Sequence, residues 1–157
     1  MAQGRHIRSG EPGSGSPLNI FGDTVTIKVA GADTGGRYTV IHGVTPPLGG
    51  PPLHLHHEDW ETFFVLSGRF AFLLDGERIE AEKGDTIHIP PGVVHQYQNI
   101  AAEPSEVLLF VEPAGLDEFF VELDALLKSS AEPDMGAIAA LHARYKMELL
   151  GPPMAAA

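Results

Sequence analysis

The sequence predicts an all-β fold, a barrel of many short strands, with two α-helices added toward the C-terminus. Short apolar and β-branched runs follow one another from residue 54 to residue 111, with turn signals between them. One of these signals, Asp75-Gly76, is typical of a two-residue hairpin, because glycine readily takes the positive φ that the turn needs. After residue 115 the apolar spacing becomes helical. Many short strands at regular spacing indicate a sandwich or a barrel, and the absence of an internal repeat indicates a single one.

The composition divides the chain into three parts. Residues 1–17 are polar and rich in Gly and Ser, which predicts a flexible N-terminal tail. The barrel is expected over residues 18–113 and a helical extension over residues 114–151. Strands of the barrel are expected at residues 23–29, 37–44, 54–58, 61–66, 70–74, 78–82, 86–89, 94–99 and 105–111.

Two amphipathic helices are expected in the extension. The first carries one apolar stripe, formed by Leu116, Phe119, Phe120, Leu123, Leu126 and Leu127. Asp134 can cap the second helix, and Gly151-Pro152-Pro153 is expected to end it. Its stripe is formed by Ile138, Leu141, Tyr145 and Leu149. These stripes must be buried on the barrel or on a second subunit, and we predict a homodimer.

Bulk composition limits the chemistry and the partners. The 157 residues suit one domain, and the absence of cysteine excludes disulfides and thiolate metal sites. With 10 basic and 21 acidic residues the formal net charge is −11, which argues against nucleic acid and anionic membranes as partners. No run is apolar and long enough for a signal peptide or a membrane span, so we expect a cytoplasmic protein. A small-molecule ligand is the expected partner.

Four side chains are candidate metal ligands. His54 and His56 are separated by one residue on an expected strand, so both imidazoles point to the same face. Glu61 comes from the next strand, and His95 follows a Pro-x-Gly turn and opens a later one. This donor set suits one divalent transition metal ion, such as Fe, Mn, Ni, Co, Cu or Zn, and leaves one or two coordination positions open. The alternative is a barrel in which these residues are ordinary polar groups.

The spacing of these residues resembles that of the cupins. Residues 54–68 fit the first cupin motif, H-x-H-x4-E-x6-G, and residues 84–99 match the second, G-x5-P-x-G-x2-H-x3-N, in full. The chain departs from the pattern at Leu48, where cupins have glycine, and at Trp60, where many have an acid. The segments 34–38, 45–52, 112–120 and 145–153 resemble single-domain bacterial cupins of the quercetin-dioxygenase-like kind. The resemblance implies a double-stranded β-helix, or jelly-roll barrel, and a metal held by His54, His56, Glu61 and His95.

Three classes of function are compatible with this site. The first is a metal-dependent dioxygenase that acts on a flavonol-like, enolic or phenolic substrate, with Glu61 also serving as catalytic base. The second is an enzyme without redox chemistry, such as an isomerase or lyase, in which the metal is a Lewis acid. The third is a binding domain without turnover. No basic recognition helix supports a role in DNA binding.

Aromatic residues are the expected walls of the substrate pocket, with burial in the core as the alternative for each. The candidates are Tyr38, Phe63, Phe72, Tyr97 and Phe110. Among the other histidines, His57 should point away from the ligands, and His88 is expected at the surface. His42 could line the barrel mouth or take part in strand pairing. We assign no chemistry to His142, which we expect beside the apolar stripe of its helix.

Overall fold

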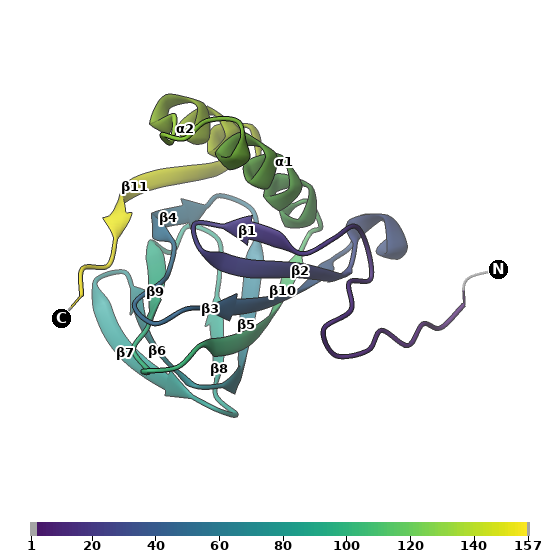
Figure 1. Ribbon diagram of the computed structural model, residues 1–157, viewed down its shortest axis with the longest axis horizontal. Coiled ribbons are helices and arrows are strands. Elements are labelled where there is room, and N and C mark those ends of the chain that lie inside the picture. Colours follow the sequence, from purple (N-terminus) through teal and green to yellow (C-terminus); the bar gives the residue numbers. More distant parts are fainter. Residues whose placement is uncertain (1–2, 157) are drawn as a thin grey trace.

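Two antiparallel sheets face each other in the computed structural model, which describes residues 3–156 (Figure 1). The six-stranded sheet has the order β1 (Leu18–Ile20), β2 (Asp23–Val29), β3 (Thr39–Thr45), β10 (Ser105–Glu112), β5 (Trp60–Ser67) and β8 (Thr86–Ile89). The five-stranded sheet has the order β11 (Met147–Pro153), β4 (Pro52–His56), β9 (His95–Asn99), β6 (Arg69–Leu74) and β7 (Glu77–Glu82). The predicted all-β barrel is confirmed, and a short 3-10 helix (Gly31–Thr34) links β2 to β3.

Alternation along the strands decides which side chains face the barrel interior. On β5, Glu61, Phe63 and Val65 are buried, whereas Trp60 and Phe64 are exposed on the other face. This period of two is the geometry of a pleated strand with one face on the core. The strand therefore delivers one carboxylate to the interior together with the apolar side chains that surround it.

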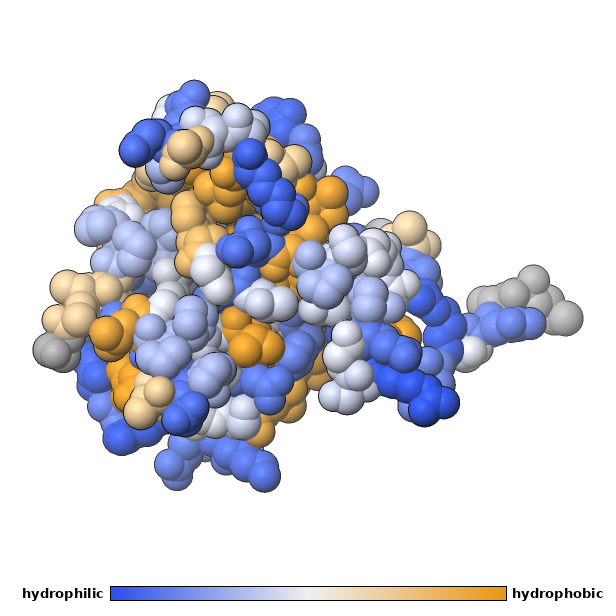
Figure 2. All heavy atoms as spheres, viewed as in Figure 1, coloured by the Kyte–Doolittle hydropathy of each residue, from blue (hydrophilic) through white to orange (hydrophobic). Residues whose placement is uncertain are grey.

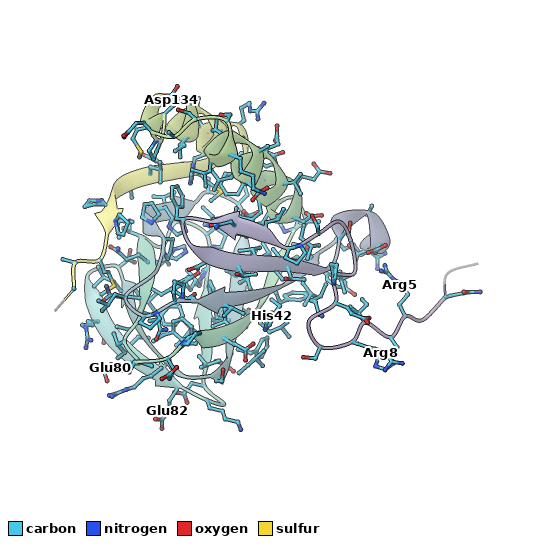
Figure 3. All side chains as sticks on the ribbon, viewed as in Figure 1. Arg5, Arg8, His42, Glu80, Glu82 and Asp134 are labelled. Atoms are coloured by element: carbon cyan, nitrogen blue, oxygen red, sulfur yellow. The ribbon has the colours of Figure 1, made fainter. Side chains whose placement is uncertain are left out.

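Two helices cover one end of the barrel, α1 (Leu116–Lys128) and α2 (Met135–Arg144) (Figure 1). The Asp134 side chain accepts a hydrogen bond from the Ala137 backbone N–H at 3.0 Å, so the expected cap is present. Asp134 lies at the pole of the molecule opposite Glu80 and Glu82 (Figure 3). Apolar surface is gathered where the helices meet the barrel, as Figure 2 shows. Part of each stripe is nevertheless buried in this chain's own core, namely Leu116, Phe119, Leu123, Ile138 and Leu141. The rest of the α1 stripe, Phe120, Leu126 and Leu127, is only partly buried.

The second helix is shorter than the sequence predicts. It ends at Arg144, Lys146 takes a positive φ of 58°, and residues 147–153 form β11, which pairs with β4. Met147 and Leu149 share one face of a strand just as well as Tyr145 and Leu149 share one face of a helix, so the apolar spacing does not separate the two. The short strand β1 was not predicted either.

The N-terminal segment has no helix or strand among residues 3–17. The Gly13 backbone N–H nevertheless donates to the Ile27 carbonyl at 2.8 Å, and Arg5 pairs with Asp33 at 3.0 Å. Figure 3 shows Arg5 and Arg8 on this segment, away from the helical end of the barrel. Within residues 3–156 no helix combines the length and the apolar character that crossing a membrane requires.

Candidate metal centre

Both sheets contribute to one cluster of candidate ligands. In the five-stranded sheet His54 on β4 stands directly opposite His95 on β9, and His56 follows two residues later on the same face. Glu61 reaches the cluster from β5 of the opposite sheet. One ligand atom from each of His54, His56, Glu61 and His95 lies within 4.8 Å of all the others. The structure thus brings together the four residues that the sequence singles out.

Each imidazole is oriented by an acceptor on its Nδ1 atom. The Nδ1 atom of His54 lies 2.7 Å from the Pro52 carbonyl oxygen, and that of His95 lies 2.9 Å from the Val93 carbonyl oxygen. His56 Nδ1 lies 2.7 Å from the carboxylate of Asp59. Since carbonyl and carboxylate oxygens only accept, Nδ1 carries the proton, and in the neutral ring Nε2 offers a lone pair to the cluster.

Glu61 faces the Nε2 atoms of two of these imidazoles. Its Oε1 atom is 3.0 Å from Nε2 of His56 and 3.0 Å from Nε2 of His95. Glu61 Oε1 and His95 Nε2 are both buried, and neither makes a hydrogen bond of acceptable geometry within residues 3–156. Buried acceptors that face one another repel unless a positive charge lies between them. The donor set and its orphaned atoms therefore fit a divalent metal ion.

The shifted pKa values of Glu61, His54 and His56 also indicate that a positive charge would be favourable within the cluster. Burial opposes ionisation of Glu61, but the imidazoles of His56, His95 and His54 outweigh it and lower the pKa of Glu61 to about 2. Burial, with the neighbouring His95 and His56, lowers the pKa of His54 to about 3, so this ring is neutral. Burial would also lower the pKa of His56, yet Glu61 and Asp59 raise it above its usual value. A proton on His56 thus partly neutralises the two carboxylates, and a metal ion would displace it.

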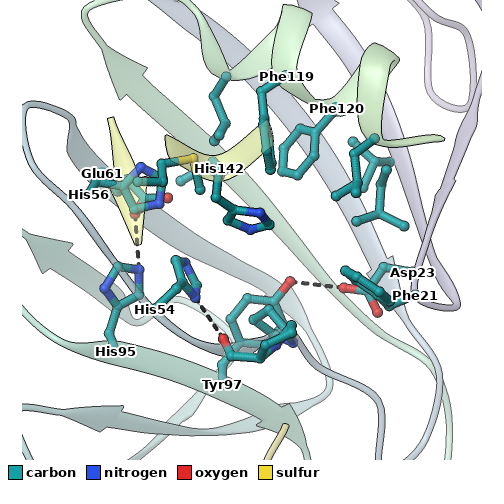
Figure 4. Close-up of a pocket in the computed structure, with 18 of the residues that line it drawn as sticks. Phe21, Asp23, His54, His56, Glu61, His95, Tyr97, Phe119, Phe120 and His142 are labelled. Carbon is teal, nitrogen blue, oxygen red and sulfur yellow. Dashed lines mark hydrogen bonds and ion pairs between the residues drawn. The ribbon is translucent and has the colours of Figure 1, made fainter. Parts of the chain in front are cut away.

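An apolar cavity adjoins the cluster (Figure 4). Its walls come from α1, α2 and strands of both sheets (β1, β2, β4, β5, β9, β10 and β11), and they include Phe63, Phe119 and Phe120. The free volume inside the cavity is about 80 Å³, and about 660 Å³ when the open solvent at its mouth is included. Figure 4 shows Glu61, His56 and His95 at one end of this cavity and Asp23 at the other.

Residues 42–111 match the family model of the cupin domain. The protein contains a cupin domain. An uncharacterized protein of Methanocaldococcus jannaschii is 35% identical over 74 residues, which are 47% of this chain and 59% of that protein. Quercetin 2,3-dioxygenase of Bacillus subtilis is 33% identical over 89 residues, which are 56% of this chain and 26% of that enzyme. The chain thus spans less than two thirds of the length of both curated relatives.

A solved structure supports the fold of the cupin domain. The crystal structure of a predicted oxalate decarboxylase from Thermotoga maritima superposes with a TM-score of 0.62 at 20% identity. The match covers 69% of this chain and 99% of that one. At this identity the likeness concerns the double-stranded β-helix alone.

Two motif residues of the cupin domain hold its strands in register. Gly68 has a φ of +78°, and a Cβ atom there would lie 1.9 Å from the Ser105 hydroxyl oxygen. Asn99 is fully buried; its amide donates to the carbonyls of Thr45 and Glu103 and its oxygen accepts from the Ser105 hydroxyl. Neither residue touches the ligand cluster, so the motif combines metal ligands with structural positions.

Two of the five aromatic residues predicted for the pocket line the cavity, and three do not. Phe63 and Tyr97 line the cavity of the cupin domain. Phe72 does not, because it lies fully buried in the core beneath Phe63, with ring centroids 5.4 Å apart. Tyr38 and Phe110 stack on each other, 5.0 Å apart, and are not among the cavity-lining residues. Val111 and its alternate neighbours on β10 face inward, so Phe110 faces outward.

His42, His57 and His88 lie outside the cluster. His57 is exposed and lies 3.3 Å from the carboxylate of Glu148. His88 is exposed, stacks on Trp60 and lies 3.1 Å from the Thr62 hydroxyl, so the surface position expected for it is confirmed. His42 lies 3.2 Å from the carboxylate of Glu106 on the neighbouring strand.

His142 is a cavity residue that sequence reasoning missed. It is only 4% exposed, lies on α2, and packs edge-on against Phe119. Its Nδ1 atom donates to the Ile138 carbonyl at 2.7 Å, so Nε2 is an acceptor, and burial lowers the pKa of the ring. The four-residue spacing from Ile138 was a signal, because it places His142 on the buried stripe and not beside it. Figure 4 shows its ring projecting into the cavity.

Asp59 is a second missed residue, and it gives a direct prediction. The Asp59→Ala variant is expected to bind a divalent metal about 10–100-fold more weakly, because His56 loses the acceptor that fixes its ring. Competition with a chelating dye measures this affinity. The matched control is Glu58→Gln, since Glu58 is exposed and pairs with Lys146 at 2.8 Å. Equal affinities for the two variants would contradict the assigned role of Asp59.

Proposed function

We propose that this protein is a metal-dependent oxidoreductase, a dioxygenase acting on a small flavonol-like, enolic or phenolic substrate. The observation that carries the proposal is the convergence of three imidazole lone pairs and one carboxylate at the end of an apolar cavity. The likeness to the Bacillus subtilis enzyme over 89 residues also supports it. A dioxygenase transfers both oxygen atoms of dioxygen to its substrate and so needs no external reductant.

In this proposal His54, His56, His95 and Glu61 hold one divalent metal ion. When bound, such an ion would supply Lewis-acid chemistry and, with a redox-active metal, oxygen-activating chemistry at this end of the cavity. Glu61 is the proposed catalytic base. Its lowered pKa keeps it ionised at neutral pH, so the carboxylate is available to accept a hydrogen bond from an incoming hydroxyl. Nε2 of His142 is a second acceptor within the same cavity.

The cavity walls suit a flat ring. Phe63 from the barrel and Phe119 and Phe120 from α1 supply aromatic surface to these walls. Such walls bind an aromatic or enolic body by dispersion and by removing its apolar surface from water. They also exclude water from the reacting end, which strengthens the electrostatic interactions of the buried carboxylate.

The test is oxygen consumption after a flavonol is added to protein loaded in turn with Fe, Mn, Co or Ni. Uptake by wild type, retained by His57→Ala and lost by His95→Ala, is the expected result, since only His95 belongs to the cluster. Absence of uptake with all four metals would eliminate the flavonol form of the proposal. Conversion of substrate without oxygen would instead support the non-redox isomerase or lyase, and recovery of unchanged bound ligand the binding domain.

A further inference from the structure

Asp23 places a second carboxylate on the cavity wall, away from the cluster of candidate metal ligands. It opens β2 in the six-stranded sheet and is only 6% exposed. The Tyr97 hydroxyl donates to its Oδ2 atom at 2.9 Å, and the Thr45 hydroxyl donates to the same atom at 3.1 Å. The other oxygen, Oδ1, is buried and accepts no hydrogen bond from any residue between 3 and 156.

Burial of the Asp23 Oδ1 atom without a donor is costly. A buried carboxylate oxygen without a donor loses its hydration and gains nothing in return. Burial accordingly raises the pKa of Asp23 to about 6, although the hydrogen bonds from Tyr97 and Thr45 oppose the rise. Among residues 3–156 the Asp23 carboxylate thus accepts its side-chain hydrogen bonds, from Tyr97 and Thr45, through Oδ2 and none through Oδ1.

The position of Asp23 relates it to the metal cluster through β9. His95 and Tyr97 are two residues apart on that strand and share a face, so their Cα atoms are separated by about 7 Å. The Tyr97 hydroxyl then reaches on to Asp23. Figure 4 shows the result, with candidate ligands at one end of the cavity, aromatic walls between, and Asp23 at the far end.

We propose that Asp23 is a specificity-determining anchor, whose free Oδ1 accepts a hydrogen bond from a hydroxyl or amine at the far end of the substrate. The proposal rests on the proposed metal site, which holds the near end. The substrate class is then narrower than any enol or phenol: a flat molecule with a chelating oxygen at one end and a hydrogen-bond donor at the other. Tyr97 and Thr45 are positioning residues that fix the Asp23 carboxylate.

The test uses two pyranones that differ by one hydroxyl. Both 5-hydroxy-2-hydroxymethyl-4-pyranone and 5-hydroxy-2-methyl-4-pyranone chelate a divalent metal through the same enol and carbonyl oxygens, and only the first has a donor at the far end. Calorimetric titration into the zinc-loaded protein avoids turnover, because zinc has no redox chemistry. Wild type is expected to bind the hydroxymethyl compound about tenfold more tightly or better, as a hydrogen bond to a charged group does.

The Asp23→Asn variant is expected to reduce this preference to about threefold or less, because a neutral amide is a weaker partner. Asp33→Asn, at a partly exposed carboxylate that pairs with Arg5, is the matched control and should keep the wild-type preference. The wild-type ratio needs no variant, so the test survives poor folding of Asp23→Asn.

Three results overturn the proposal. Equal affinity of wild type for the two pyranones would mean that the distal hydroxyl finds no acceptor, for example because a water molecule stays on Oδ1, and would leave the metal site standing. An unchanged preference in Asp23→Asn would assign the discrimination to another residue. Binding of neither compound would remove the metal site and the anchor together. A preference that depends on Asp23, without oxygen uptake in the earlier assay, would support the anchor and contradict the dioxygenase.

Discussion

The His95→Ala variant is expected to lose its divalent metal, with an affinity at least about 100-fold below that of wild type. Loss of an outer partner of a ligand alone costs about 10–100-fold, and here a ligand itself is removed. His95 is almost fully buried, and its Nε2 atom is 3.0 Å from Glu61 Oε1, so truncation removes a donor from inside the cluster. Elemental analysis after dialysis, followed by chelator competition, measures the loss.

Thermal unfolding gives an independent readout of the same prediction. A ligand that binds only the folded state at 100 times its dissociation constant stabilises that state by about 2.7 kcal/mol. Added metal should therefore raise the Tm of wild type and of His57→Ala but not that of His95→Ala. His57 is the matched control because it follows His56 directly and points to Glu148 at the surface. Equal metal content in the two variants would refute the assignment of the cluster.

The Phe72→Ala variant is expected to lower the free energy of unfolding by about 3–5 kcal/mol, the usual effect of truncating a buried phenylalanine. Phe72 is fully buried and packs against three other rings, with centroid distances of 5.4 Å to Phe63, 6.1 Å to Phe70 and 5.6 Å to Tyr97. Removal of this ring opens a cavity in the core. Denaturant unfolding of the metal-free protein measures the change.

Phe110→Ala is the control for this prediction. Phe110 is half-buried and stacks on Tyr38, so its loss removes mainly one aromatic pair, which contributes about 0.5–1.5 kcal/mol beyond its buried area. The Phe72 variant should therefore be clearly the less stable of the two. If Phe72→Ala changed ligand affinity and left stability within about 1 kcal/mol of wild type, the residue would belong to the pocket after all.

The sequence was most informative on strands whose side chains clearly alternate between the two faces. The one-residue spacing of His54 and His56 fixed their common face, and strict alternation on β5 put Glu61 inside with Phe63. On β10 the run Val107-Leu108-Leu109-Phe110-Val111 is apolar throughout, so it does not reveal which face is inward. That ambiguity is why Phe110 was a candidate for the pocket.

Two of the features that sequence reasoning missed, Asp23 and the end of α2, depend on contacts between distant segments. Asp23 and Tyr97 meet across 74 residues, through the facing of two sheets, and nothing near Asp23 marks it as a cavity residue. The end of α2 at Arg144 likewise depends on a partner, since residues 147–153 become a strand by pairing with β4. In both cases the deciding energy comes from tertiary pairing and not from local preference.

The pairing of β11 with β4 connects the covering helices to the candidate metal centre. Met147 stands opposite His56, Leu149 stands opposite His54, and the His57 backbone N–H donates to the Lys146 carbonyl at 2.8 Å. The helices α1 and α2 that cover the cavity thus continue into a strand paired with the strand that carries two of the candidate ligands. If a bound metal ion orders His54 and His56 and a ligand packs beneath α1, each is expected to raise the affinity for the other by the same factor.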